Sequence, residues 1–273
     1  MLSNGKSLLA RARAAGRYVP AFNIYNLETI QAALDASKSA GQPVILALGA
    51  AYIAQAPFRA IYAIADALSA GHPQEVVLHL DHCREMDTIR EALDVGFGSV
   101  MFDGSQLPLA ENIRLTHRVS ALAAPYGASV EGELGALNSE DGEGDALRSP
   151  YTDAAQGKRF AMESGADSLA VSIGNAHGVY RSTPHLHFAR LAEIEEATDL
   201  PLVLHGSSGI DMPTLRRAAK LGIAKVNVNT DIALAGAQAA VAALQAMENM
   251  RYDRMLPPVR RRMREVMESY FMQ

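Results

Sequence analysis

Eight short apolar segments alternate with amphipathic segments along nearly the whole chain. The apolar segments read as buried strands, and the segments between them have the spacing of helices that bury one face. The predicted strands are Val19–Phe22, Val44–Leu48, Val76–Leu80, Ser99–Phe102, Ala128–Glu133, Ser168–Ile173, Leu202–Leu204 and Lys225–Val228. Strands that alternate with helices pair in parallel, and eight is the number that closes a barrel. The sequence therefore predicts an α/β protein with a (β/α)8 barrel.

The chain length fits one such barrel. Its 273 residues predict a single domain over residues 1–273. An open doubly wound sheet is the alternative, but no G-x-G-x-x-G pattern follows the first strand. Residues 136–150, ALNSEDGEGDALRSP, interrupt the alternation after the fifth strand. Long polar loops in a compact domain are usually functional or disordered, and we expect a lid here.

Composition and charge exclude several classes of protein. Hydrophobic residues make up 49% of the chain and charged residues 20%, which predicts a sizeable core. No apolar run approaches membrane-spanning length, and the first residues lack the apolar region of a secretory signal. The net charge of -5 argues against a general nucleic-acid surface. Cys83 is the only cysteine, so no internal disulfide can form, and a cytoplasmic location is expected.

Three histidines each fall just past a predicted strand. His82 follows the third strand, His177 the sixth and His205 the seventh. Such widely spaced residues converge only if the strands are parallel and end at the same rim. Three imidazoles with a fourth position left open are typical of a catalytic zinc site. A metal enzyme is therefore the first hypothesis.

Other polar residues gather at the same ends of the strands. Asp81 and Asp103 follow the third and fourth strands, and Glu133 ends the fifth. The turn Gly206–Gly209 and the helix start at Thr230 follow the seventh and eighth strands, where barrels often bind phosphate. Barrel enzymes build their active sites at the carboxyl ends of the strands. The pattern therefore predicts an active site with a metal and an anion-binding side.

Several motifs of the chain resemble those of the zinc-dependent class II fructose- and tagatose-bisphosphate aldolases, which are TIM-barrel lyases of carbohydrate metabolism. The resemblance runs along nearly the whole chain, with the motifs in the family's order. They are Pro20-Ala21-Phe22-Asn23, His79-Leu80-Asp81-His82, Glu131-Gly132-Glu133-Leu134-Gly135, Pro150-Tyr151-Thr152-Asp153, Ile173 to Tyr180 (IGNAHGVY), Leu204 to Gly209 (LHGSSG) and Lys225 to Asp231 (KVNVNTD).

The resemblance also implies roles for individual residues. His82, His177 and His205 would bind the catalytic Zn2+, and Asp81 would transfer the proton at the aldehyde-derived oxygen. Asp103 and Glu133 match positions that hold a second divalent metal in some members, and a monovalent cation (Na+ or K+) sometimes lies near the phosphate. The residues implied to bind substrate are Asn23, Gly178, Gly206, Ser207, Ser208, Asn227, Val228, Asn229 and Thr230.

The sequence departs from the family in two places. The family's lid carries a glutamate that removes a proton from the ketone-derived carbon, and Asp141 stands at that position here, with Glu140 and Glu143 beside it. The second strand of the family ends in a serine near the substrate, whereas this chain has Ala47-Leu48-Gly49. The base and the particular ketose phosphate, fructose or tagatose 1,6-bisphosphate or another, therefore stay open.

Chemistry separates the main hypothesis from its rivals. Aldol cleavage leaves a carbanion beside a carbonyl, which a metal or a lysine Schiff base can stabilise. Four of the five lysines fall in helical or terminal contexts, and Lys225 begins the eighth strand, at the far end from the rim. A metal-dependent barrel hydrolase would carry a His-x-His pair after the first strand, where this chain has Asn23-Ile24-Tyr25. A non-catalytic, aldolase-like accessory subunit is supported only by the altered lid.

The expected partners are few. They are a phosphorylated ketose and further copies of the chain, in a homodimer or homotetramer as is usual in the family, with no nucleic acid and no membrane. The basic stretch from Arg251 to Gln273 predicts a helix that faces solvent or a second copy.

Overall fold

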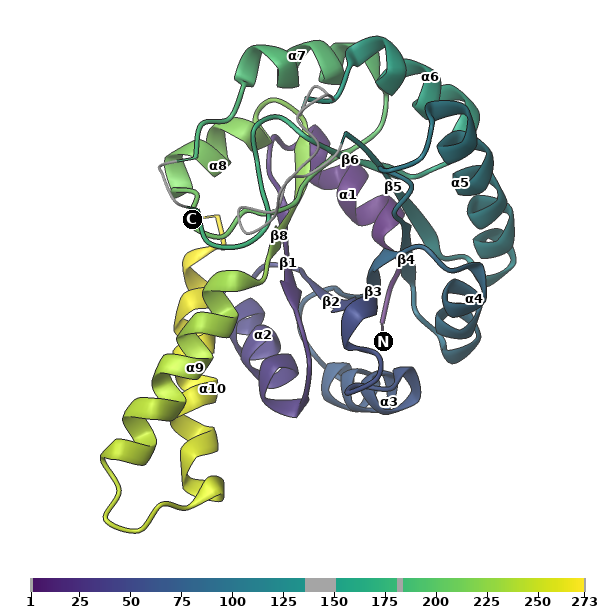
Figure 1. Cartoon of the computed structure of the whole chain (residues 1–273). Coiled ribbons are helices and arrows are strands. Elements are labelled where there is room, and N and C mark those ends of the chain that lie inside the picture. Colours follow the sequence, from purple (N-terminus) through teal and green to yellow (C-terminus); the bar gives the residue numbers. More distant parts are fainter. Residues whose placement is uncertain (1, 136–150, 181–183, 273) are drawn as a thin grey trace.

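The computed structural model describes residues 2–135, 151–180 and 184–272 and shows a closed barrel of eight parallel strands (Figure 1). Each strand pairs with the next in the sequence, and β1 closes the barrel by pairing with β8. The strands are β1 (Val19–Asn23), β2 (Val44–Gly49), β3 (Val76–Cys83), β4 (Ser99–Phe102), β5 (Ser129–Leu134), β6 (Ser168–Val171), β7 (Leu202–Leu204) and β8 (Ile223–Val228). The predicted (β/α)8 barrel is confirmed, and the predicted strand ends differ from the observed ones by at most three residues, the largest difference being at the end of β3.

Helices follow the strands and surround the barrel. They are α1 (Gly5–Ala14), α2 (Leu27–Ala40), α3 (Phe58–Ser69), α4 (Met86–Val95), α5 (Leu109–Ala123), α6 (Ala154–Ser164), α7 (Phe188–Ala197), α8 (Met212–Ala219), α9 (Thr230–Gln245) and α10 (Tyr252–Ser269), with short 3-10 turns at Ala50–Tyr52 and Ala124–Tyr126. The sequence reading did not predict α1. Its Leu8 and Leu9 pack against Val19, Ile45 and Val77 from the barrel interior. This helix therefore covers the amino-terminal end of the strands, and only the carboxyl-terminal end is left for a site.

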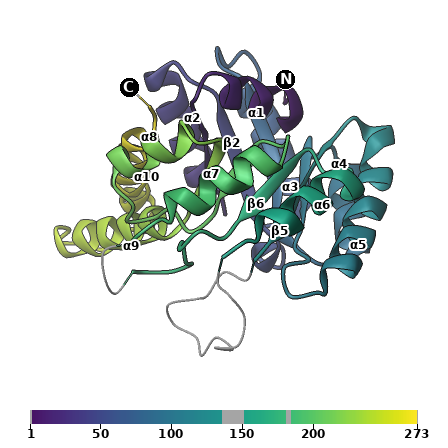
Figure 2. The ribbon, with the colours of Figure 1, turned by 90° about the horizontal axis from the view of Figure 1, so that it is seen from above.

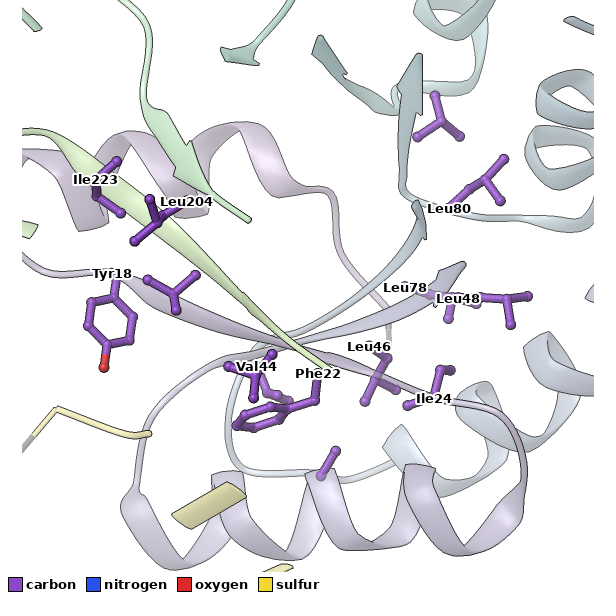
Figure 3. Packing of buried hydrophobic residues seen from close by; sticks show 14 of the residues in the cluster. Tyr18, Phe22, Ile24, Val44, Leu46, Leu48, Leu78, Leu80, Leu204 and Ile223 are labelled. Carbon is purple, nitrogen blue, oxygen red and sulfur yellow. The ribbon is translucent and has the colours of Figure 1, made fainter. Parts of the chain in front are cut away.

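The main core lies between the strands and the surrounding helices. Figure 3 shows Phe22, Val44, Leu46 and Leu78 on neighbouring strands, in the layer that packs against the helices. These side chains are buried, and Phe22 meets Phe271 edge to face at a ring distance of 5.7 Å. The helix-facing side of the strands is therefore apolar, and polar residues can be confined to the barrel interior and its rim.

The last two helices leave the barrel as a pair. Figures 1 and 2 show α9 and α10 side by side and extending outward from the strands. Along them Leu234, Val241 and Tyr252 are exposed, whereas Met263 and Met267 are buried. Among the described residues no helix is long and apolar enough to cross a bilayer. The expected lid, residues 136–150, lies outside the described residues.

Candidate active site

The predicted site residues lie at the carboxyl-terminal ends of the strands. Asp81 and His82 are near the end of β3, Glu133 is near the end of β5, and His205 follows β7 directly. The barrel's parallel order places these ends at one rim, as the sequence predicts. Among the described residues, three groups of side chains lie close enough together to hold a metal ion, and all three are at this rim or just beneath it: His82, His177 and His205; His79, Asp81 and Glu131; and His82, Asp103 and Glu133.

His82 reaches the rim through an unusual backbone conformation. Side chains alternate along a strand, so His82 would face away from the interior into which Asp81 points. Instead its φ is 50°, the one positive value at a described residue other than glycine, and the pairing of β3 with β4 shifts register between Leu80 and Cys83. A residue in this region costs about 1–3 kcal/mol and is held only by its surroundings. The bulge turns the His82 ring toward the other two histidines.

The three imidazole rings lie together. The ring centroid of His82 is 4.9 Å from that of His177 and 4.5 Å from that of His205. One nitrogen from each ring lies within 4.8 Å of the other two, and His82 Nε2 is 2.9 Å from His205 Nδ1. His205 is fully buried, while His82 and His177 are partly exposed. The triad is therefore reachable from the rim and has nitrogen donors that suit one metal ion.

The charge states of the triad favour metal binding at two rings. Burial, reinforced by the neighbouring His82 and His205, lowers the pKa of His177 to about 3. Burial and His82 also lower the pKa of His205. A metal binds neutral imidazole, so both rings are ready to donate. Burial opposes protonation of His82 too, but Asp81, Asp103 and Glu133 outweigh it and raise its pKa to about 9. Metal binding must therefore displace a proton from His82.

Asp81 lies beside the triad in a fixed orientation. Asn227 Nδ2 donates to Asp81 Oδ1 at 3.1 Å, and Asn23 Nδ2 approaches Oδ2 at 3.4 Å. Burial opposes ionisation, yet the positive charge of His82, and to a smaller extent that of Lys225, holds the pKa of Asp81 well below its usual range. The carboxylate is buried with the neighbouring asparagines. This geometry provides an ionised, oriented proton acceptor next to the three histidines.

Asp103 and Glu133 lie on the other side of His82. Arg84 donates to Asp103 Oδ2 through Nε at 2.9 Å and Nη2 at 2.7 Å, and Ser105 Oγ donates to Oδ1 at 2.6 Å. Glu133 Oε2 is 3.7 Å from His82 Nδ1 and accepts no hydrogen bond from any described residue. Burial raises the pKa of Glu133 to about 8. An unpartnered buried carboxyl oxygen can accept a cation or a substrate hydroxyl.

The predicted anion-binding turns meet on the far side of the triad. Gly206 has a φ of 60°, and a side chain there would come within 2.0 Å of the Ala176 carbonyl oxygen, so the turns after β6 and β7 approach each other closely. Ser208 Oγ accepts from the backbone N–H of Asp231 at 3.2 Å, which joins the turn after β7 to the first turn of α9. The amino terminus of this 16-residue helix therefore faces the β7 turn.

The remaining substrate-binding predictions fall in two places. Gly178 follows the triad residue His177 with a φ of 98°, so it turns the chain just past this histidine. Asn229 caps α9 by position, but its side chain bonds elsewhere: it accepts from the hydroxyl of Tyr25 and donates to that of Tyr52 at 3.2 Å. Val228 ends β8 and is buried in the main core. Val228 can therefore contribute only its backbone.

A cavity of about 460 Å³ opens beside the side chains of His82, His177 and Glu133. It is lined by His82, Arg84, Asp103, Ser105, Gln106, Glu133 and His177. Its volume suits a small sugar-sized ligand. The lid carboxylates Glu140 and Asp141, expected to supply the base, lie outside the described residues.

Sequence reasoning missed two residues of the site, Lys225 and Tyr52. Lys225 was placed at the far end of the eighth strand, but its ammonium group lies in the barrel interior, 2.7 Å from Glu131 Oε2. Tyr52 packs over Gly49, at the end of the strand where the expected serine is absent: a Cβ at Gly49 would be 3.1 Å from the Tyr52 ring. The sequence carried one signal for each, a lone lysine in an apolar strand and a glycine in place of a side chain.

Comparison with known proteins agrees with the geometry of the site. The sequence model of a family described as "Fructose-bisphosphate aldolase class-II" matches residues 3–273. This match includes the three histidines of the triad, Asp81, and the turns that follow β7 and β8.

Solved structures also resemble the chain closely. The YdjI aldolase from Escherichia coli K12 is 33% identical, with 98% of this chain and 95% of that chain covered and a TM-score of 0.86. A proposed fructose-1,6-biphosphate aldolase from Coccidioides immitis is 30% identical, with 96% and 92% covered and a TM-score of 0.84. The fructose-bisphosphate aldolase of Campylobacter jejuni, at 22% identity with 98% and 93% covered, shares the fold with a TM-score of 0.82.

Proposed function

The chain belongs to the class II fructose-bisphosphate aldolase family, a family of metal-dependent lyases, and on that premise we propose that it catalyses zinc-dependent, reversible cleavage of a ketose phosphate. The proposed substrate is fructose or tagatose 1,6-bisphosphate or a related ketose (bis)phosphate. The products are dihydroxyacetone phosphate and an aldehyde. The observation that carries this proposal is the convergence of His82, His177 and His205 beside the ionised Asp81.

The residues at the rim fit a single zinc ion. The proposed ligands are His82, His177 and His205, because each offers a nitrogen within 4.8 Å of the others and two are held neutral by burial. Three imidazoles with an open position are the donor set of catalytic zinc sites. When bound, zinc supplies Lewis-acid chemistry that polarises the ketose carbonyl and stabilises negative charge beside it.

Asp81 is proposed to move the proton that cleavage requires. Its carboxylate takes the proton from the hydroxyl on the carbon that becomes the aldehyde. The O–H electron pair then forms the new carbonyl, and the pair of the broken C–C bond passes to the carbon beside the ketone. The hydrogen bonds from Asn23 and Asn227 fix the direction in which Asp81 accepts.

The phosphate of the dihydroxyacetone half is proposed to bind between the turns after β7 and β8. Gly178, Gly206, Ser207 and Ser208 would contribute from one side, and residues 227–230 from the other. A monovalent cation, Na+ or K+, is proposed beside this phosphate. The α9 amino terminus and its tie to Ser208 support an anion here. Asn227 Oδ1 accepts no hydrogen bond from any described residue, so it is free for a cation or substrate hydroxyl.

The base at the ketone-side carbon is proposed to be Asp141 or Glu140, in the segment outside the described residues. Exchange of the proton on that carbon of dihydroxyacetone phosphate should be lost in only one of the variants Glu140→Gln, Asp141→Asn and Glu143→Gln. That variant should still bind the phosphate. Undiminished exchange in all three variants would place the base elsewhere in the chain.

Arg84 is expected to decide whether Asp103 and Glu133 hold a second divalent metal. Its guanidinium occupies Asp103 Oδ2 through two hydrogen bonds, so a second ion must compete with it. Wild-type protein should hold about one ion per chain, and Arg84→Gln should take up close to two in metal-saturated buffer. Arg90→Gln, an exposed change on α4, is the control. Equal metal content in wild type and Arg84→Gln would contradict this expectation.

The assembly and location of the protein are part of the same proposal. We propose a cytoplasmic enzyme of sugar metabolism that forms a homodimer or homotetramer. The α9–α10 pair extends from the barrel with Leu234, Val241 and Tyr252 exposed, which supports contacts between copies.

A substrate panel tests the proposed activity. Purified protein with zinc should release dihydroxyacetone phosphate from at least one of fructose 1,6-bisphosphate, tagatose 1,6-bisphosphate and ketose 1-phosphates of other lengths. Hydrolysis of an ester or amide without aldol cleavage would favour the metal-dependent hydrolase. No turnover of any ketose phosphate by a zinc-loaded protein would favour an accessory subunit.

A further inference from the structure

Two buried charged side chains beneath the histidine triad, Lys225 and Glu131, take no part in the chemistry described above. Lys225 Nζ is 2.7 Å from Glu131 Oε2, and the other carboxylate oxygen, Oε1, is 2.9 Å from His205 Nε2. These three side chains come from β8, β5 and the end of β7. Lys225 is 1% exposed, Glu131 2% and His205 0%. A lysine ammonium in the barrel interior is thus connected to a proposed metal ligand through one carboxylate.

The lysine is itself held from the other side. His79 Nε2 lies 3.1 Å from Lys225 Nζ, and His79 Nδ1 lies 2.8 Å from Ser99 Oγ. Burial and the lysine charge both lower the pKa of His79. Since Lys225 can only donate, the neutral His79 ring accepts at Nε2 and donates its Nδ1–H to Ser99. The ammonium therefore has fixed partners on two sides, and its position is defined.

Stability alone does not explain this arrangement. Interior positions of such barrels are normally filled by branched apolar side chains. A buried ion pair is often no more stable than apolar residues of the same size, because both charges lose their hydration. Packing alone therefore gives no reason for Lys225 and Glu131 to occupy the interior directly under His205.

The hydrogen bonds of His205 give a reason for placing Lys225 and Glu131 in the interior. The Nε2–H of His205 points down to Glu131, while Nδ1 points up to His82 Nε2 at 2.9 Å. A hydrogen bond at one ring nitrogen fixes the tautomer and leaves the lone pair on the other. A carboxylate behind a histidine ligand also fixes the ring's orientation. Glu131 can do this only if its own rotamer is fixed, and Lys225 holds its second oxygen.

We propose that Lys225 is a positioning residue for the metal centre: it holds Glu131 in the orientation that accepts from His205 Nε2, and so keeps His205 Nδ1 turned toward the metal. The inference rests on the proposed metal-binding role of the triad. It adds a residue that touches neither the metal nor the substrate. Its effect is on metal affinity and on the His205 tautomer.

The test compares zinc dissociation constants, measured by competition with a chromophoric chelator, in full-length variants. Lys225→Met keeps the length of the side chain and removes its charge. We expect it to weaken zinc binding by about 10–100-fold, the usual effect of losing an outer partner of a ligand histidine. Lys220→Met, which removes an exposed lysine at the end of α8, should leave zinc binding unchanged. Equal zinc affinity in folded Lys225→Met and wild type would overturn the proposal.

Adding the Lys225 substitution to the Glu131→Gln variant separates a positioning role of Lys225 from a purely structural one. If Lys225 acts through Glu131, zinc binding by Glu131→Gln should already be weakened about 10–100-fold, and adding Lys225→Met should change it little further. An independent role for Lys225 would give the same added loss in both backgrounds and would overturn the proposal. If Lys225→Met alone fails to fold, undiminished zinc affinity in Glu131→Gln overturns it equally.

Nitrogen chemical shifts of the histidines provide a readout that does not depend on bound metal. In metal-free wild type, His205 should show the Nε2–H tautomer, and Lys225→Met should show a mixture of tautomers. An unchanged His205 signal in Lys225→Met would contradict the positioning role. A wild-type protein that binds no zinc at all would instead contradict the proposed function, so the two failures are distinct.

Discussion

Replacing Asp81 with asparagine should lower the turnover of aldol cleavage by roughly two to four orders of magnitude, the usual contribution of a positioned acid or base. Asparagine has nearly the same shape, but it cannot take up the hydroxyl proton. Asn23 and Asn227 hold the carboxylate next to the triad, and its pKa lies well below the usual range, so the wild-type group is ionised and ready to accept. Turnover and zinc content are measured together on the same preparation.

The zinc content of Asp81→Asn should remain near that of the wild type. Asp87→Asn, an exposed carboxylate in the first turn of α4, is the matched control and should keep full turnover. A variant at Asp81 that loses zinc and recovers its rate when zinc is added would show that Asp81 supports the metal. In that case another group must transfer the proton.

Removing a histidine of the triad should abolish both metal retention and cleavage. His177→Ala is the clearest choice, because His177 is partly exposed and its ring lies beside the other two triad rings. The loss in zinc affinity should exceed the roughly 10–100-fold effect of removing an outer partner, since a direct ligand is lost. Zinc affinity and turnover at saturating zinc are the measurements.

Two results decide how this loss is interpreted. The thermal unfolding midpoint of metal-free His177→Ala should stay near that of metal-free wild type, which separates loss of the ligand from loss of the fold. His185→Ala, a change at an exposed loop histidine, should bind zinc and cleave substrate normally. Full zinc affinity in His177→Ala would remove His177 from the metal site.

The barrel and the place of the site could be predicted because both depend on local patterns. Apolar runs and helical spacing repeat along the chain, and parallel strands bring their carboxyl ends to one rim whatever the details of packing. The positions of His82, His177 and His205 just past three strands were therefore enough to predict that they meet, as the structure confirms.

The interior of the site depends on contacts that no local pattern encodes. The left-handed backbone of His82 arises from a register shift between β3 and β4, so strand alternation alone points its side chain the wrong way. Lys225 and Glu131 are 94 positions apart, and their ion pair depends on the stagger between β5 and β8. The pairing of Arg84 with Asp103 likewise requires the side-chain geometry of two different loops.

Turnover measured against bound metal tests most directly whether this chain is a metal-dependent aldolase. Protein stripped with a chelator is given zinc in steps, and the release of dihydroxyacetone phosphate from the best ketose phosphate of the panel is measured at each step. Cleavage should be absent from stripped protein, rise in proportion to bound zinc, and level off at about one ion per chain. Undiminished cleavage by stripped protein, or a substrate adduct trapped by borohydride, would contradict a metal-dependent reaction.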